Sequence, residues 1–203
     1  MTSATQSRDV VLVDGGGTNI GSVRYALQRL GLDAEMTADA GRISAASHVI
    51  LPGVGAAGPG MKKLRDAGLT EVLRGLRQPL LGVCLGMQLL YERSEEGDTE
   101  CLGLLPGAVE HFPASQGLRI PHMGWNLLRA ERDDALLADF GEAPYAYFVH
   151  SYAAPVTSAT IASTEHGGRF SAIVRQGNVC GMQFHPERSA AVGAHLLRNF
   201  LEL

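Results

Sequence analysis

Short apolar runs alternate with helix-like runs through the first half of the chain. The apolar runs lie at 10–13, 48–51 and 80–83, and runs with apolar residues on one helical face lie at 19–30, 61–76 and 85–90. A continuously apolar strand is buried on both faces, and helices between such strands cover both sides of a parallel sheet. The alternation therefore predicts an α/β fold with a mostly parallel central sheet flanked by helices.

The second half of the chain changes to shorter extended patterns. Candidate strands lie at 145–149, 170–175 and 179–184, and a final helix is expected at 189–201. We expect these strands to add antiparallel pairs to the same architecture, so that residues 9–203 form a single domain. The polar stretch 1–8 is expected to be a disordered or frayed N-terminal tail.

Charge and cysteine content narrow the functional classes. The chain has 203 residues and a formal net charge of −4, and its basic residues are scattered, so we expect no nucleic-acid partner. No apolar run reaches the length of about 18 residues that a membrane span needs, which indicates a cytoplasmic protein without membrane association. The three cysteines are odd in number and far apart, and we expect no disulfide framework, metal or cofactor.

A G-x-C-x-G pattern, Gly82 to Gly86, marks the point where an apolar strand becomes a helix-like run. Glycines on both sides of Cys84 allow backbone segments to approach too closely for a Cβ, as in a nucleophile elbow. At a helix start, free N–H groups favour the reactive thiolate, and the N–H of Leu85 can donate to an oxyanion. A lone cysteine in an apolar run is more often structural, but the flanking glycines favour the nucleophile.

His185-Pro186-Glu187 follows another apolar strand, at the carboxyl end where doubly wound sheets collect functional groups. The residue before a proline is extended, and positions i and i+2 of an extended segment point to the same side. His185 can therefore take a proton from Cys84 while Glu187 fixes the imidazole tautomer. The alternative is a surface histidine beside a surface glutamate; among the seven histidines, the carboxylate at i+2 favours His185.

The glycine-rich segment at 14–19 also follows a strand and opens a helix, as a phosphate cradle does. The third glycine of a dinucleotide fingerprint would fall at position 20, which is Ile20. We interpret the segment as a tight turn with Thr18 or Asn19 as the helix N-cap.

LPGVG at 51–55, GVCLGMQLL at 82–90 and HPE at 185–187 together resemble the class I, triad-type glutamine amidotransferases over nearly the whole chain. PGVGAAGPGM, PHMGWN and YFVHSY, at 52–61, 121–126 and 147–152, are similar to the glutaminase subunits of imidazole glycerol phosphate synthase, from histidine biosynthesis. The resemblance implies hydrolysis of L-glutamine to glutamate and ammonia through a thioester on Cys84. It also implies a heterodimer in which ammonia passes to a cyclase subunit.

The same resemblance implies roles for residues outside the triad. It places oxyanion and substrate-binding positions at Gly53, Val54, Gly55, Leu85, Gln88, Ser151 and Tyr152. It places a partner interface at His122, Trp125 and Asn126. Gln88 is equally consistent with a polar residue capping a buried helix, and Trp125 with a core residue.

Two other functions remain open at this level. The triad could serve another pathway, such as pyridoxal phosphate or aminobenzoate synthesis, from which PHMGWN and YFVHSY distinguish this chain. The fold could also be a non-catalytic interaction module, which the presence of all three triad residues disfavours.

Overall fold

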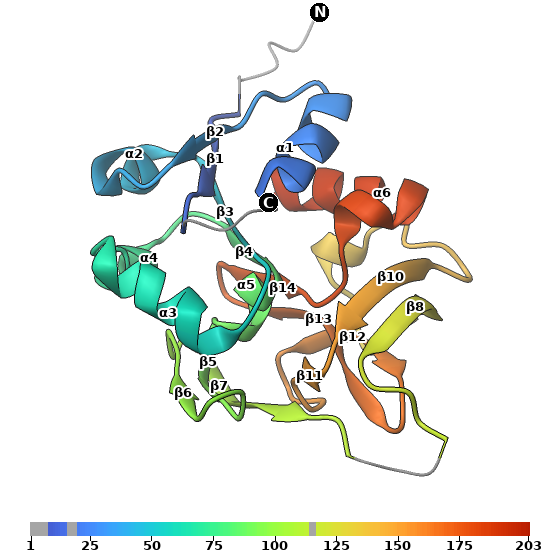
Figure 1. Ribbon diagram of the computed structural model, residues 1–203. Coiled ribbons are helices and arrows are strands. Elements are labelled where there is room, and N and C mark those ends of the chain that lie inside the picture. Colours follow the sequence, from blue (N-terminus) through green and yellow to red (C-terminus); the bar gives the residue numbers. More distant parts are fainter. Residues whose placement is uncertain (1–7, 16–19, 114–116) are drawn as a thin grey trace, which may run out of the picture.

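The computed structural model describes residues 8–15, 20–113 and 117–203, and its main sheet runs in the order β2-β1-β3-β4-β14-β13-β12-β9 (Figure 1). The parallel strands are β1 (Val10–Val13), β2 (Glu35–Thr37), β3 (His48–Gly53), β4 (Leu80–Cys84) and β14 (Val179–Met182). The antiparallel strands are β13 (Arg169–Gln176), β12 (Thr160–Glu165) and β9 (Arg129–Ala130). The predicted α/β fold with added antiparallel strands is confirmed.

Helices cover both faces of the parallel part of the sheet (Figure 1). Successive side chains of a strand point to opposite faces, so Val10 and Leu12 pack with α1 (Ile20–Arg29) and α6 (Ala190–Leu201). Val11 and Val13 pack on the other face, with α2 (Ala40–Ala45), α3 (Ala57–Asp66) and α4 (Thr70–Gly75). The result is a three-layer core in which the strands are buried from both sides.

Two predicted helices differ from those observed. The run at 61–76 forms α3 and α4 rather than one helix, because the chain leaves the helical conformation at Gly68, whose φ is +69°. Glycine adopts this left-handed conformation freely and commonly ends helices. The helix after Cys84, α5 (Leu85–Gln88), is a single turn and does not extend to Leu90.

The remaining strands form two smaller sheets. One is the antiparallel pair β8 (His122–Leu127) and β10 (Tyr145–His150). The other contains β11 (Tyr152–Ala153), β7 (Leu105–His111), β5 (Tyr91–Ser94) and β6 (Thr99–Glu100). The described residues also include two short 3₁₀ helices, η1 (Ala135–Leu137) and η2 (Pro186–Arg188).

Two expectations from the sequence concern segments outside the described residues. The tail at 1–7 and the N-cap positions Thr18 and Asn19 lie there. Arg8, at the end of the predicted tail, is described, and its guanidinium lies 2.5 Å from the carboxylate of Glu202. Across the described helices, none is both long and apolar enough to cross a membrane.

Candidate active site

Three neighbouring parallel strands bring the predicted triad together at their carboxyl ends. The pairing of β3 with β4 places Gly53 beside Cys84, and the pairing of β14 with β4 places Met182 beside Val83. His185 follows β14 by three residues, so it reaches the sheet edge where Cys84 ends β4. Residues far apart in the sequence thus meet because parallel strands share one functional edge.

Cys84 has the backbone of a nucleophile elbow. Its φ of +54° and ψ of −113° are unfavourable for a residue with a Cβ, and such strain persists only where the surroundings enforce it. The enforcement is visible at Gly86, where an added Cβ would lie 1.8 Å from the carbonyl oxygen of Leu51 in β3. The glycine therefore lets the turn press against the neighbouring strand, as the G-x-C-x-G pattern predicts.

His185 is the electrostatic partner of Cys84. Burial lowers the pKa of His185, but hydrogen bonds to Cys84 and Glu187, together with their charges, outweigh burial and raise it to about 10. The imidazole is therefore protonated at neutral pH and places a positive charge beside the sulfur of Cys84. Because α5 is only one turn long, His185, rather than a helix dipole, provides the positive charge at this position.

Glu187 orients the imidazole, although not in the predicted conformation. The Nδ1 atom of His185 lies 3.0 Å from Oε1 of Glu187, and both side chains are at least nine-tenths buried. His185 is extended, with φ −95° and ψ 98°, but Glu187 lies in the 3₁₀ turn η2. The expectation of an extended His-Pro-Glu segment is wrong from the proline onward, because η2 begins at Pro186, and the turn nevertheless brings the two side chains together.

Strand β10 holds the segment that carries His185. The N–H of His185 donates to the carbonyl of Tyr147 at 3.0 Å, and the N–H of Tyr147 donates to Oγ of Ser189 at 2.9 Å. The hydroxyl of Ser189 in turn donates to the carbonyl of His185 at 2.7 Å. The position of His185 thus depends on β10, a strand that also has an exposed face.

A cleft of about 400 Å³ opens over Cys84 and His185, a size typical of small-molecule sites. The cleft includes predicted site residues from both halves of the chain: Val54, Gly55, Cys84, Leu85, Gln88, Ser151, Tyr152 and His185. Gly53 lines a neighbouring apolar hollow of about 300 Å³, which shares Val54, Gly55 and Leu85 with the cleft. The 53–55 segment therefore separates two open volumes.

Three cleft residues with ionisable side chains were not predicted from the sequence: Glu96, His150 and Arg188. Glu96 is half-buried, and its Oε2 accepts a hydrogen bond of 2.7 Å from the N–H of Ala57 at the start of α3. It belongs to an acid-rich run, SEEGDTE, in which the sequence offers no signal to single out one carboxylate. Its place in the same cleft as Cys84 emerges only from the fold.

His122 lies in a buried aromatic cluster, so it does not belong to the predicted partner-facing surface. Its side chain is 5% exposed and stacks on His166, with ring centroids 4.1 Å apart. Its Nδ1 lies 3.4 Å from Nε2 of His150, whose Nδ1 donates to the carbonyl of Tyr152 at 2.7 Å. Burial lowers the pKa of His150 to about 3 and that of His122 to about 4, with neighbouring histidines adding to the effect.

Because the pKa values of His122 and His150 are lowered, we expect the free energy of unfolding to decrease in mild acid. The unfolded chain binds their protons below a pKa of about 6.5, whereas the folded chain binds them only near pH 3 to 4, so the free energy of unfolding should fall as pH decreases between these values. Urea denaturation at pH 6.5 and at pH 5 measures this decrease in the free energy of unfolding. The decrease should be about 1–2 kcal/mol smaller in His122→Phe than in the wild type. His195→Phe is the control, and equal losses in the wild type and His122→Phe would contradict the assignment.

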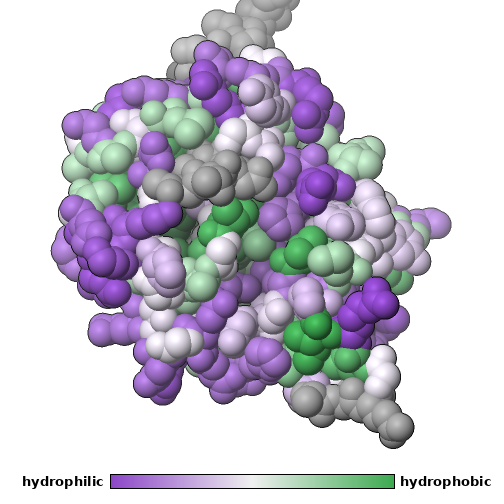
Figure 2. Space-filling view, in the orientation of Figure 1, coloured by the Kyte–Doolittle hydropathy of each residue, from purple (hydrophilic) through white to green (hydrophobic). Residues whose placement is uncertain are grey.

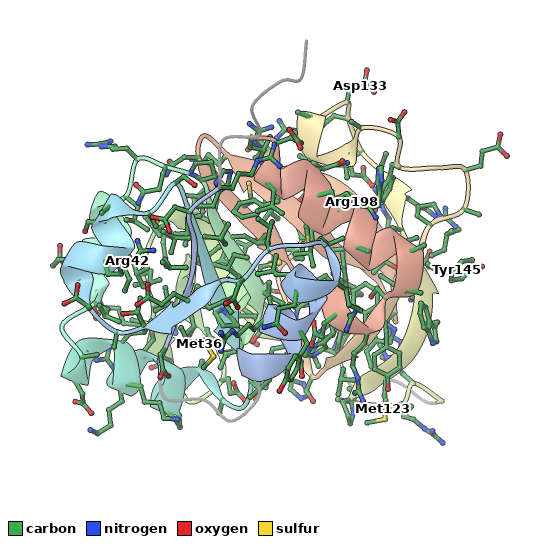
Figure 3. The ribbon with its side chains drawn as sticks, turned by 90° about the horizontal axis from the view of Figure 1, so that it is seen from above. Met36, Arg42, Met123, Asp133, Tyr145 and Arg198 are labelled. Carbon is green, nitrogen blue, oxygen red and sulfur yellow. The ribbon has the colours of Figure 1, made fainter. Side chains whose placement is uncertain are left out.

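The outward face of the β8–β10 pair carries large apolar side chains. Trp125 and Met123 on β8 are 53% and 59% exposed, and Tyr145 on β10 is 49% exposed. Met123 and Tyr145 lie on the same side of the molecule (Figure 3). Trp125 is paired with Tyr147, and their rings lie 5.9 Å apart. Trp125 is therefore a surface residue, and the alternative that it belongs to the core is excluded.

We call Met123, Trp125, Tyr145 and Tyr147 the aromatic face. Asn126 follows Trp125 at the edge of the aromatic face. It is half-buried, and its Nδ2 donates to the carbonyl of Glu165 at 2.7 Å. The surface seen in Figure 2 is mostly hydrophilic, with apolar residues gathered in limited areas. Contiguous exposed aromatic residues on such a surface are typical of a protein–protein contact.

The chain matches known proteins along nearly its whole length. Residues 11–203 match the family model described as glutamine amidotransferase class-I. The protein named imidazole glycerol phosphate synthase subunit HisH from Xanthomonas axonopodis pv. citri is 62% identical over 195 residues, covering 96% of this chain and 98% of that protein. The protein of the same name from Xylella fastidiosa strain Temecula1 is 57% identical, with the same coverage.

Solved structures share the fold at lower sequence identity. A crystal structure of a glutamine amidotransferase is 24% identical, with a TM-score of 0.73 over 95% of this chain and 97% of that chain. The structure of PurLQS from Thermotoga maritima is 21% identical, with a TM-score of 0.71 over 97% of this chain and 98% of that chain. At these identities, the likeness concerns the fold alone.

Proposed function

Because the chain belongs to the class-I glutamine amidotransferase family, and within it to the HisH subunits of imidazole glycerol phosphate synthase, we propose that Cys84, His185 and Glu187 carry its glutaminase reaction. The chain is a glutamine amidotransferase of histidine biosynthesis. The observation that supports the residue assignment is the strained Cys84 beside a buried His185–Glu187 pair. Its described cysteines are free thiols, and we place the protein in the cytoplasm.

The reaction follows from the charges of the triad. The thiolate of Cys84 attacks the amide carbon of glutamine, and His185 gives its proton to the departing nitrogen, so that ammonia leaves as the C–N bond breaks. His185, now neutral, removes a proton from water as that water attacks the thioester. Glutamate leaves and the thiolate returns. Glu187 holds the imidazole in one orientation and stabilises its positive charge through both steps.

The oxyanion of each step needs N–H donors beside Cys84. The N–H of Leu85, the residue after the nucleophile, is one donor in an elbow of this kind. The second donor comes from the 53–55 segment, which pairs with the end of β4 at Gly53 and lines the cleft at Val54 and Gly55. The apolar hollow behind this segment leaves space for its peptide groups to reorient.

The far end of the cleft binds the amino-acid end of glutamine. Glu96 and Gln88 present oxygen acceptors to the α-ammonium group. Ser151, between β10 and β11, and Tyr152, the first residue of β11, line the same cleft and position the α-carboxylate. The cleft thus fixes the substrate at its charged end and presents its amide to Cys84.

The partner is the cyclase subunit of the synthase, and the aromatic face is where it docks. A closed contact there would carry ammonia away from water, in which it would be protonated and lost. The same contact would reach the base, because the backbone of Tyr147 bonds to His185 and to Ser189. Arg188, which lines the cleft, lies 5.4 Å above the ring of Tyr147. Docking on this strand can therefore adjust the catalytic site.

Glutamine turnover by the chain should be low alone and should rise when the cyclase subunit and its nucleotide ligand are added. Trp125→Ala should weaken the association by about 2–4 kcal/mol, because an exposed tryptophan at the centre of an aromatic face is a typical anchor. Calorimetry measures the association, and glutamate release measures the stimulation.

The matched control is Tyr25→Ala, which removes another exposed aromatic side chain, 63% exposed, from α1. It should bind and respond like the wild type. Equal glutamine turnover with and without the cyclase subunit would reject the proposed coupling, and unchanged affinity in Trp125→Ala would place the contact elsewhere.

A further inference from the structure

The side chain of Gln88 is fixed by hydrogen bonds below the cleft. Its Nε2 atom donates to the carbonyl of Tyr152 at 2.9 Å and to Oε1 of Gln183 at 3.1 Å. The side chain is only 5% exposed, yet it contributes to the cleft wall. Both hydrogens of its NH₂ group are therefore used inside the protein.

The orientation of this amide follows from the chemistry of its partners. A backbone carbonyl can only accept hydrogen bonds, so the Gln88 atom that faces Tyr152 must be the nitrogen. The same carbonyl also accepts from Nδ1 of His150 at 2.7 Å. The carbonyl of Tyr152 thus fixes one N–H of Gln88, and the second N–H requires another acceptor.

Gln183 supplies that acceptor from an unusual position. Its side chain is fully buried two positions before His185, and its backbone N–H bonds to the carbonyl of Ala172 in β13 at 2.9 Å. Its Nε2 is buried and has no hydrogen-bond partner within the described segments. A buried polar atom without a partner reduces stability, so an apolar side chain would suit the core better. The hydrogen bond that Oε1 of Gln183 accepts from Nε2 of Gln88 is the compensating interaction.

We propose that Gln183 is a positioning residue that locks the Gln88 amide with its oxygen, rather than its nitrogen, towards the cleft. With both N–H groups of Gln88 occupied, Oε1 is the atom left for a ligand. Together with the carboxylate of Glu96, it forms a site of acceptors only, which selects an α-ammonium group. This inference rests on the proposed glutaminase function and assigns to Gln183 a role in substrate selectivity.

The test compares L-glutamine with glutaramate, the analogue in which hydrogen replaces the α-amino group. Gln183→Met keeps the side-chain length but has no strong acceptor, so the Tyr152 carbonyl alone holds the Gln88 amide. Because His150 still donates to that carbonyl, the amide loses part of its orientation and can turn its NH₂ group into the cleft. For the full chain in complex with the cyclase subunit, the ratio of kcat/KM for glutamine to that for glutaramate should fall roughly tenfold, the effect of one charged hydrogen bond. The loss should lie in KM, with kcat for glutamine within about twofold.

Two further variants separate positioning from a general structural effect. Gln183→Glu should restore the wild-type ratio, because a neutral carboxylic acid in this buried place offers the same acceptor. Gln78→Met removes a half-buried amide that bonds to the carbonyls of Ile43 and Ser44, at the far end of β4, and should leave the ratio unchanged. If Gln183→Met does not fold, Gln183→Leu provides the same test.

The outcomes distinguish this inference from the function on which it rests. A Gln183→Met complex that keeps the wild-type ratio, or that loses activity equally on both substrates, overturns the positioning role while glutamine hydrolysis by the wild type stands. A wild-type complex that does not hydrolyse glutamine removes the proposed function and this inference with it.

Discussion

Cys84→Ala should abolish glutamine hydrolysis, with kcat lowered by roughly four to six orders of magnitude, because the reaction loses its nucleophile. The residual rate would come from the oxyanion donors and from substrate binding alone. The variant should still bind glutamine and the cyclase subunit, since the cleft and the aromatic face do not depend on the thiol. Release of glutamate by the complex measures the rate, and calorimetry measures both binding events.

Cys101→Ala is the matched control. Cys101 is a buried cysteine, and burial raises the pKa of its thiol to about 11, so it is a poor nucleophile. This variant should keep the wild-type kcat. A diazo ketone analogue of glutamine should label the wild type and Cys101→Ala, but not Cys84→Ala. Labelling that persists without Cys84 would assign the nucleophile to another residue.

Gly86→Ala should destabilise the fold severely, by about 3–5 kcal/mol or enough to prevent folding. The new Cβ would overlap the carbonyl oxygen of Leu51, 1.8 Å away, and the next atom it meets is the carbonyl carbon of the same residue at 2.9 Å. Neither contact is with a flexible side chain, so the elbow and β3 would have to separate. Urea denaturation, or the soluble yield if the variant does not fold, measures the effect.

Gly75→Ala provides the comparison in the same sheet–helix layer. Gly75 lies in α4, and an added Cβ there would meet no atom within 4 Å. Since alanine is favoured over glycine in helices by about 1 kcal/mol, this variant should be slightly more stable than the wild type. Wild-type stability in Gly86→Ala would show that the elbow and β3 are not in close contact.

The sequence predicted those parts of the site that depend on local pattern. Cys84 was identified because glycines and a strand-to-helix change surround it, and His185 because a carboxylate follows two residues later at the end of a strand. Both features are local, and parallel strands then bring them to one edge. The fold class followed from the same alternation of apolar and amphipathic runs.

Features that depend on distant contacts were not predicted. Glu96 reaches the cleft because β5 and β6 pair beneath α3, which no pattern within its acidic run reveals. His122 was assigned to the surface beside Trp125, but alternate residues of β8 face opposite sides, and His122 faces the core. The role proposed for Gln183 likewise depends on a partner 95 positions away in the sequence.

The central pairing of β4 with β14 also sets the order in which the site can form during synthesis. Cys84 emerges about one hundred residues before His185, which is an interval of roughly 5–20 s at typical translation rates. Throughout this interval the nascent chain carries Cys84 without the imidazole proposed as its partner. The proposed triad is therefore completed late, when β14 pairs with β4 and brings His185 to Cys84.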